Sequence, residues 1–175
     1  SSPGGTGTLN IQDSGLVEVG STFRIWTDGT VNLSGGTLTL NGPLLDGGGT
    51  FNFTSGTMNV NDATQQLIAS SGDIALGGLI LGPAFVLSTG QTINLAGNAR
   101  VDFGGQLTLG GGTLNAPSLL VQTGGTLANT AGSSTANAPV LALAGSAINV
   151  SGGDLTVGDP TAVNGFYSNS TASVA

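Results

Sequence analysis

The sequence contains no cysteine, histidine or lysine, and these absences exclude several classes of protein. Without cysteine and histidine the chain has no disulfide framework, no zinc site of the common kinds and no Ser–His or Cys–His catalytic pair. Its two basic residues, Arg24 and Arg100, cannot neutralise a run of phosphates, so we expect no nucleic-acid partner. Nine acidic residues leave a net charge of −7 on a sparsely charged chain.

Long hydrophobic runs are also missing, although the composition is sufficient for a core. The uncharged stretch between Asp73 and Arg100 is broken by glycines, a proline and small polar residues, and the chain has no apolar run of 18 residues. We therefore expect no membrane-spanning helix. Hydrophobic residues make up 38% of the 175, and the mean hydropathy is +0.29. These values predict a packed chain rather than a disordered one, even though glycine supplies 32 residues.

The apolar residues follow a short alternating pattern that begins again after each glycine-rich or aspartate-containing turn. Examples are Asp28–Leu33, Gly49–Phe53, Gly56–Val60 and Gly112–Asn115. Apolar residues two positions apart, with polar residues between them, indicate short β-strands with one buried face. The 3.6-residue spacing of an amphipathic helix is missing. The pattern therefore predicts an all-β fold.

These strands sort into three interleaved series that each repeat about every 21 residues. The first comprises Leu9/Ile11, Val31/Leu33, Phe51/Phe53, Ile74/Leu76, Ile93/Leu95 and Leu114/Ala116. The second comprises Val17/Val19, Leu38/Leu40, Met58/Val60, Leu79/Leu81, Val101/Phe103, Leu119/Val121 and Leu141/Leu143. The third comprises Ile25, Leu45, Leu67, Leu87, Leu107, Leu127 and Ile148. The series predict a three-sided β-solenoid, a right-handed parallel β-helix of roughly seven to eight turns.

We interpret residues 1–175 as a single β-solenoid segment. The first series lacks an apolar pair near position 134, where Thr130–Thr135 is small and polar, so we expect a loop insertion over 130–137. Neither end shows a capping helix or a cluster of charges. Because solenoid ends expose strand edges, we expect the segment to belong to a longer rod or to stack end to end.

The segment Gly35–Gly42, which reads GGTLTLNG, and its degenerate copies resemble the passenger repeats of autotransporters and of filamentous-haemagglutinin-like adhesins. This resemblance implies a right-handed β-helix in a protein that is secreted or displayed on the bacterial cell surface. Gly4–Leu9 imitates the start of the calcium repeat Gly-Gly-x-Gly-x-Asp, but Leu9 stands at the position of the ligating aspartate. We therefore expect no metal or other cofactor.

Two sets of outward side chains are candidate interaction surfaces. The first, a threonine column beside an asparagine column, comprises Thr8, Asn10, Thr30, Asn32, Thr50, Asn52, Thr92, Asn94, Thr113 and Asn115. It is interpreted either as an amide ladder that stabilises the rod or as a surface that recognises glycan, neighbouring rods or ice. The second is the predicted outward column Glu18, Thr39, Asn59, Ile80, Asp102, Leu120 and Ala142. Within it, Ile80 and Leu120 would expose apolar surface for contact with another chain.

These observations favour a structural function over a catalytic one. Polysaccharide lyases and hydrolases also use β-helices, but the acidic residues here fall mostly at corners of different turns, without the close carboxylate pair of a glycosidase. We expect an extracellular rod or fibre, such as a stalk, filament or matrix component, that self-associates end to end or laterally. The alternative is a surface adhesin that binds glycan or a host molecule through the Thr/Asn face or the 130–137 loop. A polysaccharide-active enzyme is the third hypothesis.

Overall fold

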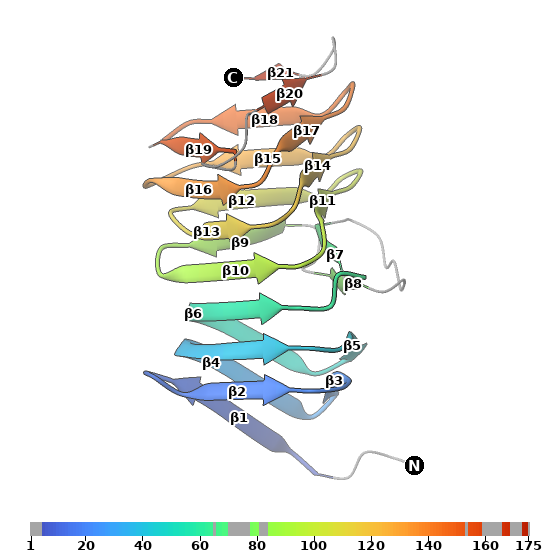
Figure 1. Ribbon diagram of the computed structural model, residues 1–175, viewed down its shortest axis with the longest axis vertical. Coiled ribbons are helices and arrows are strands. Elements are labelled where there is room, and N and C mark those ends of the chain that lie inside the picture. The colour runs from blue at the N-terminus through green and yellow to red at the C-terminus, as the bar shows by residue number, and fades with distance from the viewer. Residues whose placement is uncertain are drawn as a thin grey trace.

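The chain winds as a parallel β-solenoid in a computed structural model that describes residues 5–64, 66–69, 78–80, 84–152, 154–158, 166–168 and 173–174. It has three parallel sheets and about 6 turns of about 21 residues each (Figure 1). In that view the near strands run from left to right and the far strands from right to left while the chain climbs, so the coil is right-handed. The expected fold class is confirmed.

The front face is the broad face nearest the viewer in Figure 1, and it is a continuous parallel sheet. Its rungs are β2 (Leu16–Val19), the second halves of β4 (Gly29–Leu40) and β6 (Thr50–Val60), β10 (Gln91–Leu95), β13 (Thr113–Asn115), β16 (Ser134–Asn137) and β19 (Leu155–Val157). Because β4 and β6 continue round a corner, their first halves belong to the face behind.

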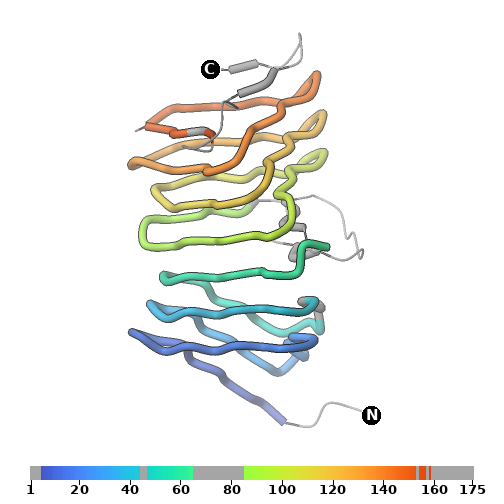
Figure 2. The backbone as a smooth tube through the Cα atoms, viewed as in Figure 1, coloured from blue at the N-terminus to red at the C-terminus, as the bar shows by residue number. Residues whose placement is uncertain are grey.

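Two further faces complete the coil, as the backbone trace in Figure 2 shows. The back face contains β1 (Gly7–Gln12), the first halves of β4 and β6, β9 (Ala84–Ser88), β12 (Gln106–Gly110), β15 (Thr126–Asn129), β18 (Ala147–Val150) and β21 (Ser173–Val174). The side face contains β3 (Phe23–Trp26), β5 (Leu44–Gly47), β7 (Gln66–Ala69), β8 (Gly78–Ile80), β11 (Ala99–Val101), β14 (Leu119–Val121), β17 (Val140–Ala142) and β20 (Phe166–Ser168).

Glycine makes the corner between the two halves of the long strands possible. Gly35 in β4 and Gly56 in β6 have φ angles of +109° and +102°, a region that L side chains rarely adopt. Successive corners also stack closely, because a Cβ atom added to Gly56 would lie 2.4 Å from the carbonyl oxygen of Gly36. The turn-by-turn recurrence of glycine therefore has both a conformational and a steric cause.

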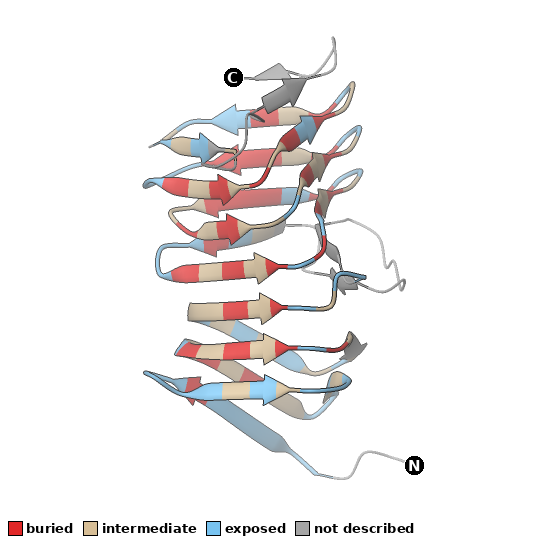
Figure 3. Cartoon of the chain, in the orientation of Figure 1, coloured by how far each residue is buried: buried red, intermediate tan, exposed pale blue. Residues whose placement is uncertain are grey.

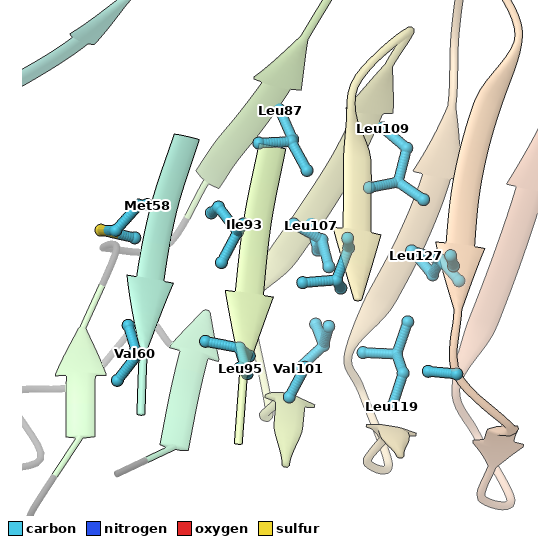
Figure 4. Packing of buried hydrophobic residues seen from close by; sticks show 14 of the residues in the cluster. Met58, Val60, Leu87, Ile93, Leu95, Val101, Leu107, Leu109, Leu119 and Leu127 are labelled. Atoms are coloured by element: carbon cyan, nitrogen blue, oxygen red, sulfur yellow. The ribbon is translucent and has the colours of Figure 1, made fainter. Parts of the chain in front are cut away.

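The hydrophobic core fills the inside of the coil, where inward residues of successive turns stack on one another. Figure 3 shows buried residues alternating with half-buried ones along the front strands, as the two-residue period of a strand requires. In Figure 4 the side chains of Met58 and Val60 lie beside those of Ile93 and Leu95 from the next rung. Leu33, Leu38, Leu40, Leu109, Leu114 and Leu127 are 0% exposed.

In the middle of the rod, the predicted series change from one face to another. The expected number of turns is therefore corrected. Ile93 of the first series stacks on Met58 of the second, and not on Phe51 of its own series. Adjacent rungs are 35 residues apart at this point rather than about 21, so the coil has about 6 turns instead of seven to eight. One extra strand explains the difference, because β8 pairs with the edge of β7 opposite β11 and so adds a second strand to the side face in this turn.

Some predicted inward residues fall elsewhere or outside the described part. Ile74, Leu76 and Leu81 lie outside the described residues, and Leu79 belongs to the side face. Further along, Val140 and Ala142 are buried, whereas Leu141 is 43% exposed, so the predicted inward pair Leu141/Leu143 is wrong by one residue.

A polar side chain bridges the back face beside this junction. The first half of β6 and strand β9 share no backbone pairing, and among the described strands β9 pairs with β12 alone. Gln91, which is 5% exposed, donates from Nε2 to the carbonyl oxygen of Phe53 and accepts from the backbone N–H of Ser88. On the back face, one glutamine amide thus takes the place of a strand ladder between β6 and β9.

The expected loop over 130–137 is wrong, because its second half is strand β16. Ser134 and Ala136 occupy the inward positions of that strand and are 1% and 0% exposed. The Ser134 hydroxyl donates to Asn129 Oδ1 at 2.7 Å and accepts from the Gly111 N–H at 2.9 Å. Small and polar residues are tolerated at this core position because the hydroxyl is satisfied internally. The hydrophobic pattern alone therefore does not predict strand β16.

Candidate functional site

The front face presents two straight columns of uncharged polar side chains. Threonine occupies one column in six successive rungs, namely Thr37, Thr57, Thr92, Thr113, Thr135 and Thr156. Two residues further along the strands runs the second column, Thr39, Asn59, Asn94, Asn115 and Asn137. Between the columns lie buried residues such as Leu38 and Ile93, so alternation along each strand turns both columns outward.

The second column is a continuous hydrogen-bonded ladder, which we call the front ladder. Each amide Nδ2 donates to the oxygen of the residue one rung closer to the N-terminus. Asn59 donates to Thr39 Oγ1 at 3.1 Å, and Asn94 donates to Asn59 Oδ1 at 2.7 Å. Asn115 and Asn137 continue the ladder at 2.5 Å each. The amides are half-buried and fixed by their neighbours, so the face is rigid as well as regular.

A separate, shorter ladder lies on the back face. Asn32 donates to Asn10 at 2.7 Å, and Asn52 donates to Asn32 at 2.8 Å. The neighbouring threonines Thr8, Thr30 and Thr50 stack in the same register.

The predicted Thr/Asn surface therefore does not form one column pair. Thr8, Asn10, Thr30, Asn32, Thr50 and Asn52 lie on the back face, whereas Thr92, Asn94, Thr113 and Asn115 lie on the front. The front columns instead contain residues that the sequence pattern did not single out as site residues, including Thr57, Thr135 and Asn137. The Gly-Thr-x-Asn motif of Gly56–Asn59 recurs in the front ladder at Gly112–Asn115, but it also occurs on the back face at Gly29–Asn32, so the motif alone does not tell the two faces apart.

A double-mutant cycle tests which ladder contains Asn94. We expect Asn59→Ala and Asn94→Ala to couple by about 0.5–1.5 kcal/mol in the free energy of unfolding, because each removes the partner of the other. The matched control pairs Asn94→Ala with Asn52→Ala, which occupies the back ladder and should show additivity. Urea titration of the three single variants, the two double variants and the parent measures both coupling free energies. Coupling to Asn52 but not to Asn59 would contradict the ladder assignment.

The predicted apolar pair Ile80 and Leu120 occupies equivalent register positions on the side face. The strand register places Ile80, Ile68, Arg100, Leu120, Leu141 and Tyr167 in successive positions. Leu120 is half-buried, and the side chain of Ile80 lies outside the description. The other predicted members are misplaced, because Glu18, Thr39 and Asn59 belong to the front face and Asp102 lies just beyond β11.

Charged groups are few and engage near neighbours. Arg100 forms an ion pair with Asp102, with Nε 2.6 Å from Oδ1, and Glu18 accepts a hydrogen bond from Asn41 at 2.7 Å. The hydroxyl and the backbone N–H of Thr64 hold the pKa of Asp62 below its usual value. Within the described ranges, no three His, Cys, Asp or Glu side chains are grouped so that they could bind a metal ion. The surface therefore offers arrays of neutral hydrogen-bonding groups.

Comparisons with protein-family models, with curated proteins and with solved structures gave no match. What the structure establishes of the resemblance to bacterial surface repeats is the parallel β-solenoid fold. In the part of the chain that the structure describes, no helix has the length and apolar character needed to cross a membrane.

Proposed function

We propose that this chain is a structural segment of an extracellular rod or fibre, in which the solenoid itself is the functional element. It would serve as a stalk, a filament or a component of a matrix at a bacterial surface. In this role the protein maintains a fixed shape and presents regular faces. The setting outside the cell follows from the resemblance of Gly35–Gly42 to surface-protein repeats and belongs to the proposal.

The observation that carries this proposal is the unbroken front sheet. Seven rungs from β2 to β19 follow one another in parallel register, and the amide ladder runs beside them along the rod axis. Because each rung contacts only its neighbours, length grows in equal steps of about 4.8 Å per turn. Such a construction suits a spacer whose length is set by the number of turns.

The adhesin hypothesis now depends on the polar faces alone, because the 130–137 segment does not supply the protruding loop that it also invoked. A binding pocket for a small ligand is ordinarily concave and lined with apolar and aromatic groups. The front columns are straight and contain neither aromatic nor charged residues. This surface favours contact with an extended, regular partner.

Electron microscopy combined with two binding assays tests the proposed function. Purified protein should give short rods or filaments, should not bind any component of a glycan array saturably, and should not release sugars from polysaccharides. A heat-unfolded sample is the control for adsorption that does not depend on the fold. Saturable binding of one glycan by a monodisperse monomer would support the adhesin hypothesis instead. Hydrolysis or elimination that a single Asp substitution abolishes would overturn both.

A further inference from the structure

We propose that two copies of this chain associate side by side through the front face, with the threonine column and the front ladder of one copy packed against those of the other. The inference rests on the proposed structural role and names the partner of its most regular surface. The occupant is a second copy of the chain, and the contact residues are centred on Thr92, Asn94, Thr113 and Asn115.

The geometry of the face matches that of its own copy. Rungs repeat at about 4.8 Å, and the two columns lie about 7 Å apart because they are two residues apart along each strand. The six threonines therefore extend over about 24 Å. A second copy has the same spacing between rungs. When one rung of each copy is aligned, all the other rungs of the two front faces are therefore aligned as well, and no other class of partner guarantees this alignment.

The side chains retain the hydrogen-bonding capacity that such a contact needs. Each asparagine within the front ladder uses one N–H and one acceptor position, which leaves a second N–H and a second lone pair. The threonines add hydroxyl and methyl groups. Since the ladder already fixes the amides, little side-chain entropy remains to be lost on association. Asparagine ladders and close side-chain packing stabilise paired sheets in the same way.

Charge also favours this face over the other two. Neither front column contains an ionisable residue between Thr37 and Asn137, whereas the side face contains the Arg100–Asp102 ion pair. The back face is interrupted where Gln91 bridges β6 and β9. Acidic groups lie toward the ends of the front face, at Glu18 and Asp154, and the chain as a whole has a charge of −7. Salt should therefore strengthen the association by screening repulsion between copies.

The area of the face sets the expected affinity. A strip about 24 Å long and about 14 Å wide buries roughly 700 Å² over both copies, about half of a standard protein interface. This chain should therefore form weak, concentration-dependent pairs, and each additional turn in a longer rod would add contact area. A test must consequently capture a transient pair.

Cysteine cross-linking provides that test, because the chain has no cysteine of its own. Thr113→Cys places a single thiol on the front face, and Gln106→Cys places one at an exposed position on the back face as the matched control. A bismaleimide linker should convert Thr113→Cys to dimer at least about fivefold more efficiently than Gln106→Cys, with the difference increasing with protein concentration and salt. Circular dichroism should confirm that both variants fold.

A second variant tests whether the cross-linking depends on the front face. Adding Thr92→Lys to Thr113→Cys places a charge one rung away and should reduce cross-linking to the level of Gln106→Cys. Equal cross-linking of the front and back thiols, or no effect of Thr92→Lys, would overturn the proposal. Because rods can exist without lateral pairing, this failure would leave the electron-microscopy test of the structural role unaffected.

Discussion

Leu114→Ala should lower the free energy of unfolding by about 2–5 kcal/mol, the range measured when a buried leucine is truncated to alanine in a core. Leu114 is 0% exposed and stacks between Ile93 and Ala136 in the front rungs. The neighbouring Ala136 is too small to fill the cavity, and the paired strands cannot move together without losing backbone hydrogen bonds. Equilibrium urea unfolding followed by circular dichroism measures the loss.

Leu141→Ala is the matched control, because it removes the same atoms from the outward column of β17. Leu141 is 43% exposed, so we expect a loss below about 1 kcal/mol. If the two substitutions cost the same, the assignment of inward and outward positions along these strands would be wrong.

Gly56→Ala should destabilise the protein by about 2 kcal/mol or more. The φ angle of +102° is unfavourable for a residue with a Cβ atom, and that atom would meet the Gly36 carbonyl oxygen at 2.4 Å. Relief would require two stacked corners to separate, which would disturb the pairing of β4 with β6. The midpoint of urea unfolding should fall accordingly.

Gly7→Ala is the corresponding control. Gly7 lies in the exposed strand β1 at an ordinary φ angle, and nothing lies within 4 Å of an added Cβ atom. Its effect should remain within about 0.5 kcal/mol. A similar loss in both variants would show that glycine content, rather than the stacked corner, governs stability.

The solenoid was predictable from the sequence because its two main determinants are local. Alternation of apolar and polar residues indicates short strands, and glycine marks the corners where φ must be positive. The 21-residue interval then identifies which strands are equivalent. This logic places Leu9 on Val31 correctly. It is wrong by two residues for Leu119, which pairs with Ala99, whereas Val101 pairs with Val121.

The errors arose where the turn length changes or where the core is polar. Spacing alone could not show that β7 and β8 both lie on the side face, so two apparent turns were counted where the register advances by one rung. The sequence predicts a loop at Ser134 because the burial of this residue depends on hydrogen bonds to Asn129 and Gly111, which lie outside its own strand. The sequence pattern shows that the Thr/Asn surface is regular. It does not show that this surface is divided between the back face and the front face, because the same miscounted turn hides the change of face.

We expect the rod to unfold as two cooperative units that meet at the Gln91 bridge. In a linear array, unfolding spreads from turn to turn only as far as the interface between neighbours is strong. At this level the back strands have a single glutamine amide between them in place of a ladder, while the front rungs β6 and β10 remain paired. We therefore expect partial unfolding to stop at the boundary between Val60 and Ala84. Local unfolding of one half of the rod would then leave the other half folded.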